Sequence, residues 1–214
     1  MEVRQYVWIN PVIEAMAGVR YPEILKKISK QGFAIVSCTT GLGRVRDEYK
    51  SVLAKQRSRP LIDTRCPVIR EVVSERYPEL SELLADIPPI LMACAQDIYE
   101  EYIKKSKVPA CLTMVTPCSA LAKYGNENFG SVAYFTTWTE FCKKNHIQIQ
   151  LERAGISPIP PGFFRFSEYK ICETSGEVPV NDMLEQVVQK QLDAELLELL
   201  YCHDGCINGD GVLT

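Results

Sequence analysis

Residues 60–80 read PLIDTRCPVIREVVSERYPEL and join a short apolar segment to an amphipathic one. Residues 60–64 are short, apolar and partly β-branched, which predicts a buried strand. Pro67 suits the first position of the helix that follows, and this places Cys66 at the N-cap of that helix. The helix dipole and the free N–H groups favour a thiolate there. The stretch therefore predicts a strand, a cysteine and a helix in immediate succession.

The same alternation continues along the whole chain. Further strands are predicted from short apolar runs at 32–38, 110–116 and 131–136, and amphipathic helices at 21–31, 44–56 and 90–105. Strands that alternate with helices predict βαβ units and a largely parallel sheet, so we expect an α/β fold. We expect a boundary between two lobes near residues 107–112, where KVPA (107–110) separates the long helix from the next strand.

Two local patterns refine this expectation in the second half of the chain. Thr137 and Glu140 have the spacing of a capping box, which predicts the start of a helix. Residues 154–166 are too rich in proline and glycine for a core element, so we expect a loop. The sequence FFRF at 163–166 is interpreted as a small hydrophobic hairpin at the end of that loop.

The composition limits the class of protein. The 214 residues are 46% hydrophobic, which is enough for one large domain or two small lobes with real cores. A formal net charge of -3 does not favour nucleic acid as a partner. No apolar run approaches the roughly 18 residues of a membrane span, and the first residues lack the pattern of a signal peptide. We therefore expect a cytoplasmic protein without a membrane span.

Nine cysteines are many for a cytoplasmic chain, and an odd number excludes complete internal pairing. In a reducing compartment, clustered cysteines more often indicate metal or redox chemistry than disulfides. Five of them stand apart from any motif and are interpreted as small buried apolar residues: Cys38, Cys94, Cys111, Cys142 and Cys172.

The other four cysteines come from three segments. Cys66 and Cys118 each follow a predicted strand and precede a helix, while Cys202 and Cys206 lie in the C-terminal loop CHDGCINGDG. Sites in such α/β folds form beyond the carboxyl ends of the strands. Four thiolates suit either zinc or an iron–sulfur cluster. Two single ligands and a C-x-x-x-C spacing fit a structural zinc site poorly, so the pattern favours an iron–sulfur cluster over zinc.

Taken in order, these motifs resemble those of the catalytic domain of the iron-only ([FeFe]) hydrogenases and their non-catalytic relatives. Residues 63–80 resemble the T-S-C-C-P-G-W segment with its downstream Tyr-Pro-Glu-Leu. Residues 115–123, VTPCSALAK, resemble the M-P-C-x-x-K-K segment. Residues 201–211, YCHDGCINGDG, resemble the final A-C-x-x-G-C-x-x-G-G-G.

The resemblance implies a two-lobed α/β domain over residues 1–214, with lobes at about 1–108 and 109–214. Each lobe would be a small, mostly parallel sheet flanked by helices, with a [4Fe–4S] cluster buried between the lobes. The cluster ligands implied are Cys66, Cys118, Cys202 and Cys206. In the hydrogenases the last of these cysteines also bridges to a diiron subcluster.

The resemblance also bears on residues 193–202, DAELLELLYC. Their leucine and glutamate content predicts a helix by propensity. The resemblance instead implies a strand that delivers Cys202 to the cluster, and we expect a strand at 197–201.

The departures from the family pattern concern the diiron chemistry. Arg65 stands where the hydrogenases have a proton-relay cysteine, and an arginine stays protonated near neutral pH. Leu121 replaces the lysine that contacts a cyanide ligand, and the glycine-rich segment of the family is unrecognisable in residues 158–176. Asp210 interrupts the terminal triple glycine. The ligands of the cube remain, while much of the apparatus for the diiron unit is gone.

This pattern favours an iron–sulfur protein in electron transfer or in redox or hydrogen sensing, with an electron-transfer or signalling protein as its partner. One alternative is an active hydrogenase or other reductase with a diiron unit attached at Cys206. The other is a structural zinc protein.

Two polar residues beside the cysteines have two interpretations each. Arg65 either clamps an anion or substrate or satisfies carbonyls at a helix end. His203 either lies in a solvated turn or tunes the cluster through a hydrogen bond.

Overall fold

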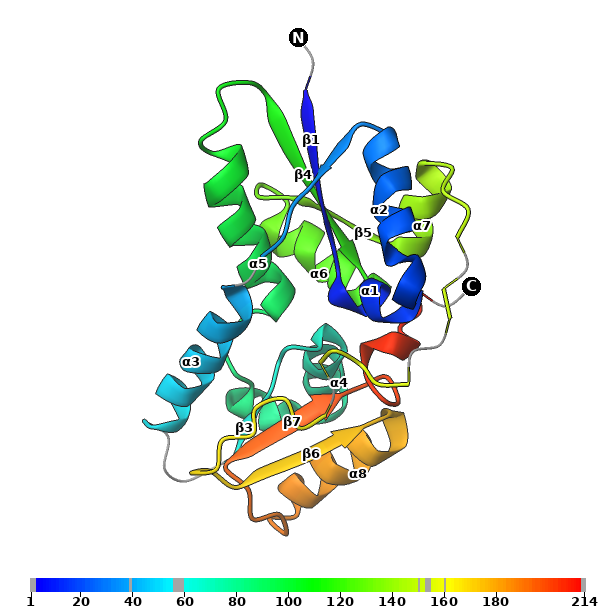
Figure 1. The fold of residues 1–214 in the computed structure, drawn as a ribbon. Helices are drawn as coiled ribbons and strands as arrows, with labels where there is room; N and C mark the ends of the chain where they lie inside the picture. The colour runs from blue at the N-terminus through cyan, green and yellow to red at the C-terminus, as the bar shows by residue number, and fades with distance from the viewer. Residues whose placement is uncertain are drawn as a thin grey trace. The chain divides into compact units, whose positions relative to one another are not determined.

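The computed structural model describes residues 3–38, 40–55, 60–149, 151–152, 155–159 and 161–212 (Figure 1). These residues form two compact units. Unit 1 comprises Met1–Gly41, Leu91–Pro158 and Ile207–Thr214, and unit 2 comprises Leu42–Ile90 and Ile159–Cys206. The units differ from the lobes expected at 1–108 and 109–214, because the chain passes between them after Gly41, Ile90, Pro158 and Cys206.

Unit 1 is built on a four-stranded sheet in the order β2-β1-β4-β5, and every pairing is parallel. The strands are β1 (Arg4–Ile9), β2 (Phe33–Ile35), β4 (Ala110–Thr116) and β5 (Tyr134–Thr137). The strands expected at 32–38, 110–116 and 131–136 are thereby confirmed. Strand β1 was not predicted, although RQYVWI is aromatic and β-branched and buries its last four residues.

The helices of unit 1 pack on this sheet. They are α1 (Pro11–Ala17), α2 (Tyr21–Lys30), α5 (Ile90–Ile98, from Leu91 onwards), α6 (Ser119–Phe129) and α7 (Trp138–Lys144), with the short turns η1 (Gly18–Arg20) and η3 (Tyr99–Ile103). Helix α2 contacts β2, and α6 contacts β4 and β5. The capping box is confirmed, because Glu140 N donates to Thr137 Oγ1 at 3.2 Å and Thr137 N donates to Glu140 Oε2 at 3.1 Å.

Unit 2 contains a three-stranded parallel sheet in the order β3-β7-β6. Its strands are β3 (Leu61–Ile62), β6 (Ile171–Ser175) and β7 (Leu196–Leu200), and its helices are α3 (Gly41–Leu53, from Leu42 onwards), α4 (Pro67–Arg76), η2 (Pro78–Leu83) and α8 (Glu177–Val188). The α/β class with parallel sheets in both units is as expected. The turn η4 (Cys206–Asn208) begins at the last residue of unit 2, and its other two residues belong to unit 1.

The central strand β7 confirms the strand expected near 197–201. All five of its residues are buried, as is typical of a strand covered on both faces of a parallel sheet. Its leucines join an apolar core with Ile62, Ile69 and Leu184. Burial between two strands therefore decides the conformation against the helical propensity of the segment.

The hairpin expected at 163–166 is wrong. These four residues form no strand, although the described part of the 154–166 segment is irregular, as expected for a loop. Phe164 and Phe166 are buried, and the Phe164 ring lies 4.4 Å from the ring of Tyr49 on α3. The aromatic side chains thus fill the interior of unit 2 and do not form a separate hairpin.

Candidate functional site

Unit 2 brings three of the four predicted ligands together at one edge of its sheet. Cys66 follows β3 and is the N-cap of α4, with Pro67 in the first turn as expected. Cys202 follows β7, the parallel neighbour of β3, so the two chain segments leave the sheet at the same edge. The Tyr201 N–H donates to the Cys66 sulfur, and the charges of Cys66 and Cys202 both act on Cys206.

Burial dominates the acidity of these thiols. It raises the pKa of Cys66, although the N–H groups of Tyr201, Ile69 and Val68 all act to lower it. The pKa of Cys206 is raised to about 12, mainly by burial and further by the charges of Cys66 and Cys202. The helix N-terminus alone therefore does not hold Cys66 as a thiolate. A bound metal would do so, because coordination displaces the thiol proton.

Arg65, beside Cys66, is buried between two carboxylates. Its Nε donates to Asp63 Oδ2 at 2.7 Å and its Nη2 donates to Glu198 Oε1 at 2.6 Å. Both carboxylates are fully buried, and Arg65 is only 6% exposed. Burial lowers the pKa of Arg65, but the charges of Asp63 and Glu198 outweigh it and raise the pKa above its ordinary value. These bonds go to carboxylates and not to carbonyls at a helix end.

Aromatic rings and backbone groups fix this ion cluster in place. The Arg65 guanidinium carbon lies 4.5 Å from the Phe163 ring centre and 4.6 Å from that of Phe164. Glu198 accepts the N–H groups of the same two residues, at 2.7 and 3.2 Å. The Tyr49 hydroxyl donates to Asp63 Oδ1 at 2.7 Å. Sequence reasoning missed Asp63, Glu198 and Tyr49, although a glutamate inside the apolar run 196–200 is a signal of a buried partner.

One nitrogen of the Arg65 guanidinium, Nη1, is buried, and within the described ranges of the chain it has no hydrogen-bond partner. An unpaired buried donor of this kind costs about 1–3 kcal/mol, and more when it is charged. The positive charge of Arg65 lowers the pKa of Cys206, so the guanidinium lies near the thiols. A negatively charged cluster held by these thiolates would offer sulfur acceptors to Nη1, so the residues fit an iron–sulfur cluster.

Cys118 lies in unit 1, at the N-cap of α6 and directly after β4, as the sequence predicts. The C-terminal segment packs against its turn, because Gly211 N donates to Pro117 O at 3.0 Å. A Cβ atom on Gly209 would lie 2.4 Å from Pro117 O and 3.2 Å from Cys118 Cβ. Only a glycine therefore fits against the Cys118 turn at position 209.

Asp210, which interrupts the expected triple glycine, has a structural role that sequence reasoning missed. Its Oδ1 accepts the Ser119 N–H at 2.8 Å, and its Oδ2 accepts the Ser119 hydroxyl. The carboxylate thus caps the start of α6 next to Cys118, where a negative charge also complements the helix dipole.

His203 agrees with the simpler of its two interpretations. Its side chain is 77% exposed, and its Nδ1 lies 2.8 Å from Asp204 Oδ2. Asp204 and Gly205 have φ angles of 56° and 86°, so the chain turns sharply between the two cysteines. The geometry is that of a solvated turn.

In the part of the chain that the structure describes, no group of three or more His, Cys, Asp or Glu residues is arranged to hold a single metal ion. An iron–sulfur cluster distributes its cysteine ligands over several irons, so its thiolates do not converge on one atom. None of the described helices is long and apolar enough to cross a membrane.

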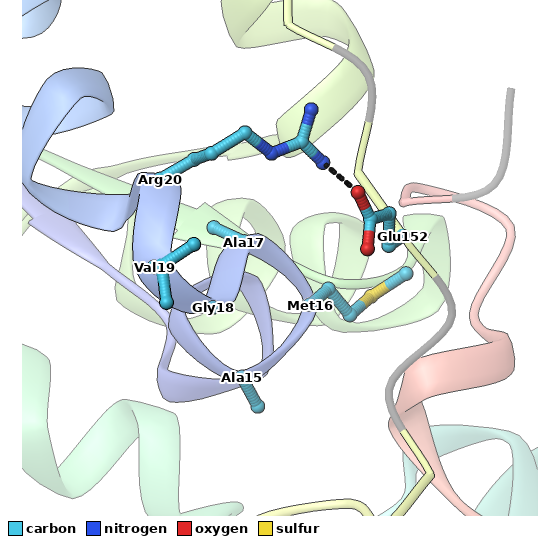
Figure 2. A pocket seen from close by; sticks show the side chains of 7 residues that line it. All are labelled: Ala15, Met16, Ala17, Gly18, Val19, Arg20 and Glu152. Carbon is cyan, nitrogen blue, oxygen red and sulfur yellow. Dashed lines mark ion pairs between the residues drawn. The ribbon is translucent and has the colours of Figure 1, made fainter.

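A pocket of about 350 Å³ lies elsewhere in unit 1, beside α1 (Figure 2). It is lined by Ala15, Met16, Ala17, Gly18, Val19, Arg20 and Glu152. The ion pair between Arg20 Nη2 and Glu152 Oε1, at 3.0 Å, borders it, and both side chains are solvent-exposed. No cysteine lines this pocket, so it is separate from the candidate cluster site.

Solved structures match this architecture over almost the whole chain. A variant of the [FeFe]-hydrogenase HydA1 from Chlamydomonas reinhardtii matches with a TM-score of 0.73, covering 99% of this chain and 80% of that one at 10% identity. This chain has the fold of an [FeFe]-hydrogenase. An apo variant of the same HydA1 gives a TM-score of 0.68 at 9% identity, with the same coverage.

A further structure, of the [FeFe]-hydrogenase HydA(deltaEFG), matches this chain with a TM-score of 0.67 at 9% identity. That structure is described as revealing stepwise assembly of the H-cluster. It also covers 99% of this chain and 80% of its own. No protein-family model and no curated protein matches the sequence. At such low identity the fold is shared, and the chemistry of the site must be argued from the residues of this chain.

Proposed function

We propose that this chain binds one [4Fe–4S] cluster through Cys66, Cys118, Cys202 and Cys206, and that it acts in electron transfer or in redox or hydrogen sensing. The support is the gathering of three partly buried thiols beside a guanidinium N–H that has no partner among the described residues, in a chain with the hydrogenase fold. When bound, such a cluster supplies a one-electron redox centre.

The course of the chain supports Cys118 as the fourth ligand. Gly209 packs against the Cys118 turn, and only two residues separate Gly209 from Cys206. Because an extended chain spans at most about 3.6 Å per residue, Cys206 cannot lie far from Gly209. The close packing of Gly209 and the cap from Asp210 therefore anchor the end of the C-terminal cysteine loop to the Cys118 turn.

Arg65 determines what the site does with protons. It occupies the position that the resemblance gives to a proton-relay cysteine, and its two buried carboxylate partners keep it charged. A permanently protonated group neither accepts nor passes on a proton. We therefore propose a centre that exchanges electrons with a partner protein, and no hydrogen-evolving activity.

The first experiment is metal analysis of the full chain after anaerobic purification. We expect about four irons and four sulfides per chain, with the absorption of an iron–sulfur cluster. Stoichiometric zinc without iron would overturn the proposal. Infrared bands from metal-bound carbonyl and cyanide, together with hydrogen release from reduced viologen after co-expression with the maturation proteins, would instead support the enzyme alternative.

A further inference from the structure

A second pair of cysteines meets in unit 1, on either side of one glycine. Cys38 lies between β2 and α3, and Cys94 lies on α5. The Gly41 N–H donates to the Cys38 sulfur, while a Cβ atom on Gly41 would lie only 2.7 Å from the Cys94 sulfur. The absence of a side chain at position 41 therefore lets Cys94 approach, and the Cys94 thiol hydrogen-bonds to Cys38. Both cysteines were interpreted from the sequence as small buried apolar residues.

Polar groups surround Cys38 on its other sides. Its sulfur lies 3.8 Å from Thr40 Oγ1 and 3.9 Å from Asp97 Oδ2, and the Thr40 hydroxyl donates to the same Asp97 oxygen at 2.5 Å. The N–H groups of Thr40 and Gly41 both point at the sulfur. Cys38 is partly exposed, whereas Cys94 is only 5% exposed. Small molecules in solution can thus reach the Cys38 sulfur, whereas Cys94 is buried.

The acidity of Cys38 agrees with this geometry. The hydrogen bond from Cys94 is the largest influence, and with the N–H groups of Gly41 and Thr40 it lowers the pKa of Cys38 to about 6, against the effect of burial. Burial alone raises the pKa of Cys142 to about 12. Reactive cysteines are accessible thiols with a low pKa, and those in redox couples have a second thiol within reach. Cys38 is accessible, has a low pKa and has Cys94 within reach. Cys142 does not have a low pKa.

We propose that Cys38 and Cys94 form a reversible dithiol–disulfide couple that exchanges with small-molecule disulfides, with Cys38 as the attacking thiol and Cys94 as the resolving thiol. The inference does not rest on the cluster, because neither cysteine is among its proposed ligands.

The exchange balances in two steps. The Cys38 thiolate attacks one sulfur of the small disulfide, whose S–S bond breaks, and one small thiolate leaves and takes up the proton that Cys38 released. The Cys94 thiol then loses its proton and attacks the Cys38 sulfur, and the second small thiol leaves with that proton. Two protein thiols are oxidised to one disulfide, and one small disulfide is reduced to two thiols.

The test uses the full chain and oxidised glutathione as the probe. After incubation near pH 7, remaining thiols are blocked with N-ethylmaleimide in denaturant, and the digested peptides are mapped by mass spectrometry. We expect a disulfide-linked pair of peptides that contain Cys38 and Cys94, and we expect dithiothreitol to separate them. Cys142 should be recovered with N-ethylmaleimide attached.

Variants divide the two roles. Cys94→Ser should stop the reaction at the first step, so that Cys38 accumulates a glutathione adduct. Cys38→Ser should leave Cys94 unmodified because it is buried, and Cys142→Ser should form the linked pair as the wild type does. A glutathione adduct on Cys38 without any linked pair in the wild type would overturn the couple. So would the absence of both species in the wild type, a result that needs no variant to fold.

Discussion

Arg65 Nη2 lies 2.6 Å from Glu198 Oε1, in an ion pair whose two side chains are both buried. Burial raises the pKa of Glu198, against the opposing effects of the Arg65 charge and of the N–H groups of Phe163 and Phe164. The pair ties the residue next to the first cysteine to the central strand and to the 161–166 segment. Because these groups are buried away from water, losing Glu198 would leave its hydrogen-bond donors without an acceptor, although Arg65 would keep Asp63 as a counter-charge.

Replacement of Glu198 tests this pair. Glu198→Leu would leave Arg65 paired with Asp63, but Arg65 Nη2 and the N–H groups of Phe163 and Phe164 would lose their acceptor, so we expect a loss of about 3–5 kcal/mol in the free energy of unfolding. Urea unfolding of the cluster-free protein measures it. The control is Glu185→Gln on the exposed face of α8, which should change stability by less than about 0.5 kcal/mol. Equal stability of the two variants would show that the ion pair contributes nothing.

Arg65 Nη1, which has no hydrogen-bond partner among the described residues, predicts an effect on the proposed redox centre. Arg65→Lys keeps the positive charge but removes the guanidinium fork, and with it the Nη1 donor beside the thiols. A hydrogen bond to cluster sulfur favours the more negative reduced state, so its loss should lower the midpoint potential while the iron content stays unchanged. A potentiometric titration followed by electron paramagnetic resonance measures the potential. An unchanged potential would mean that Nη1 does not reach the cluster.

The fourth ligand is tested by Cys118→Ala. A cube held by three thiolates loses the anchor of one iron, so iron and sulfide per chain should fall to well below half of the wild-type content. The matched control is Cys111→Ala, which removes an exposed thiol from β4, the strand before Cys118. It should leave the iron and sulfide content intact. Wild-type iron and sulfide in Cys118→Ala would remove this ligand set.

The contact between Gly209 and the Cys118 turn predicts that even one methyl group is harmful. In Gly209→Ala the new Cβ would meet the backbone oxygen of Pro117 at 2.4 Å, and a backbone atom cannot move aside as a flexible side chain can. We expect a lower melting temperature and a lower yield of cluster. Gly43→Ala adds the same methyl group on α3, where nothing lies within 4 Å, and should be neutral or stabilising by up to about 1 kcal/mol. Identical behaviour of the two alanine variants would contradict the close fit.

The low pKa of Cys38 predicts how its reactivity depends on pH. Below a pH of about 6 the sulfur is protonated and should react slowly with iodoacetamide; above it the thiolate dominates, and the rate should reach a plateau well before pH 8. Peptide mapping at a series of pH values gives the midpoint. In Cys94→Ala the largest stabilising hydrogen bond is gone, so the midpoint should move to higher pH. A wild-type rate that still rises between pH 8 and 9 would be incompatible with a stabilised thiolate.

Local chemistry was enough to predict several parts of the fold. The β-branched run 110–116, the proline after Cys66 and the pair Thr137 and Glu140 each act through neighbours only a few residues away. For the same reason the N-cap positions of Cys66 and Cys118 could be read from the order of strand, cysteine and helix. These features depend on backbone preferences that the chain carries with it into any fold.

The sequence by itself thus determined the α/β alternation, the motif cysteines and their places at strand ends. Tertiary structure alone decided the rest, because it depends on burial among residues distant in sequence. Glu198 lies among apolar residues in a central strand and forms an ion pair with Arg65. Phe164 packs on Tyr49 and does not form the expected hairpin. Cys38 becomes acidic only where Gly41 lets Cys94 approach it. No local sequence pattern predicts these contacts, because their energies come from desolvation and packing that exist only once the chain has folded.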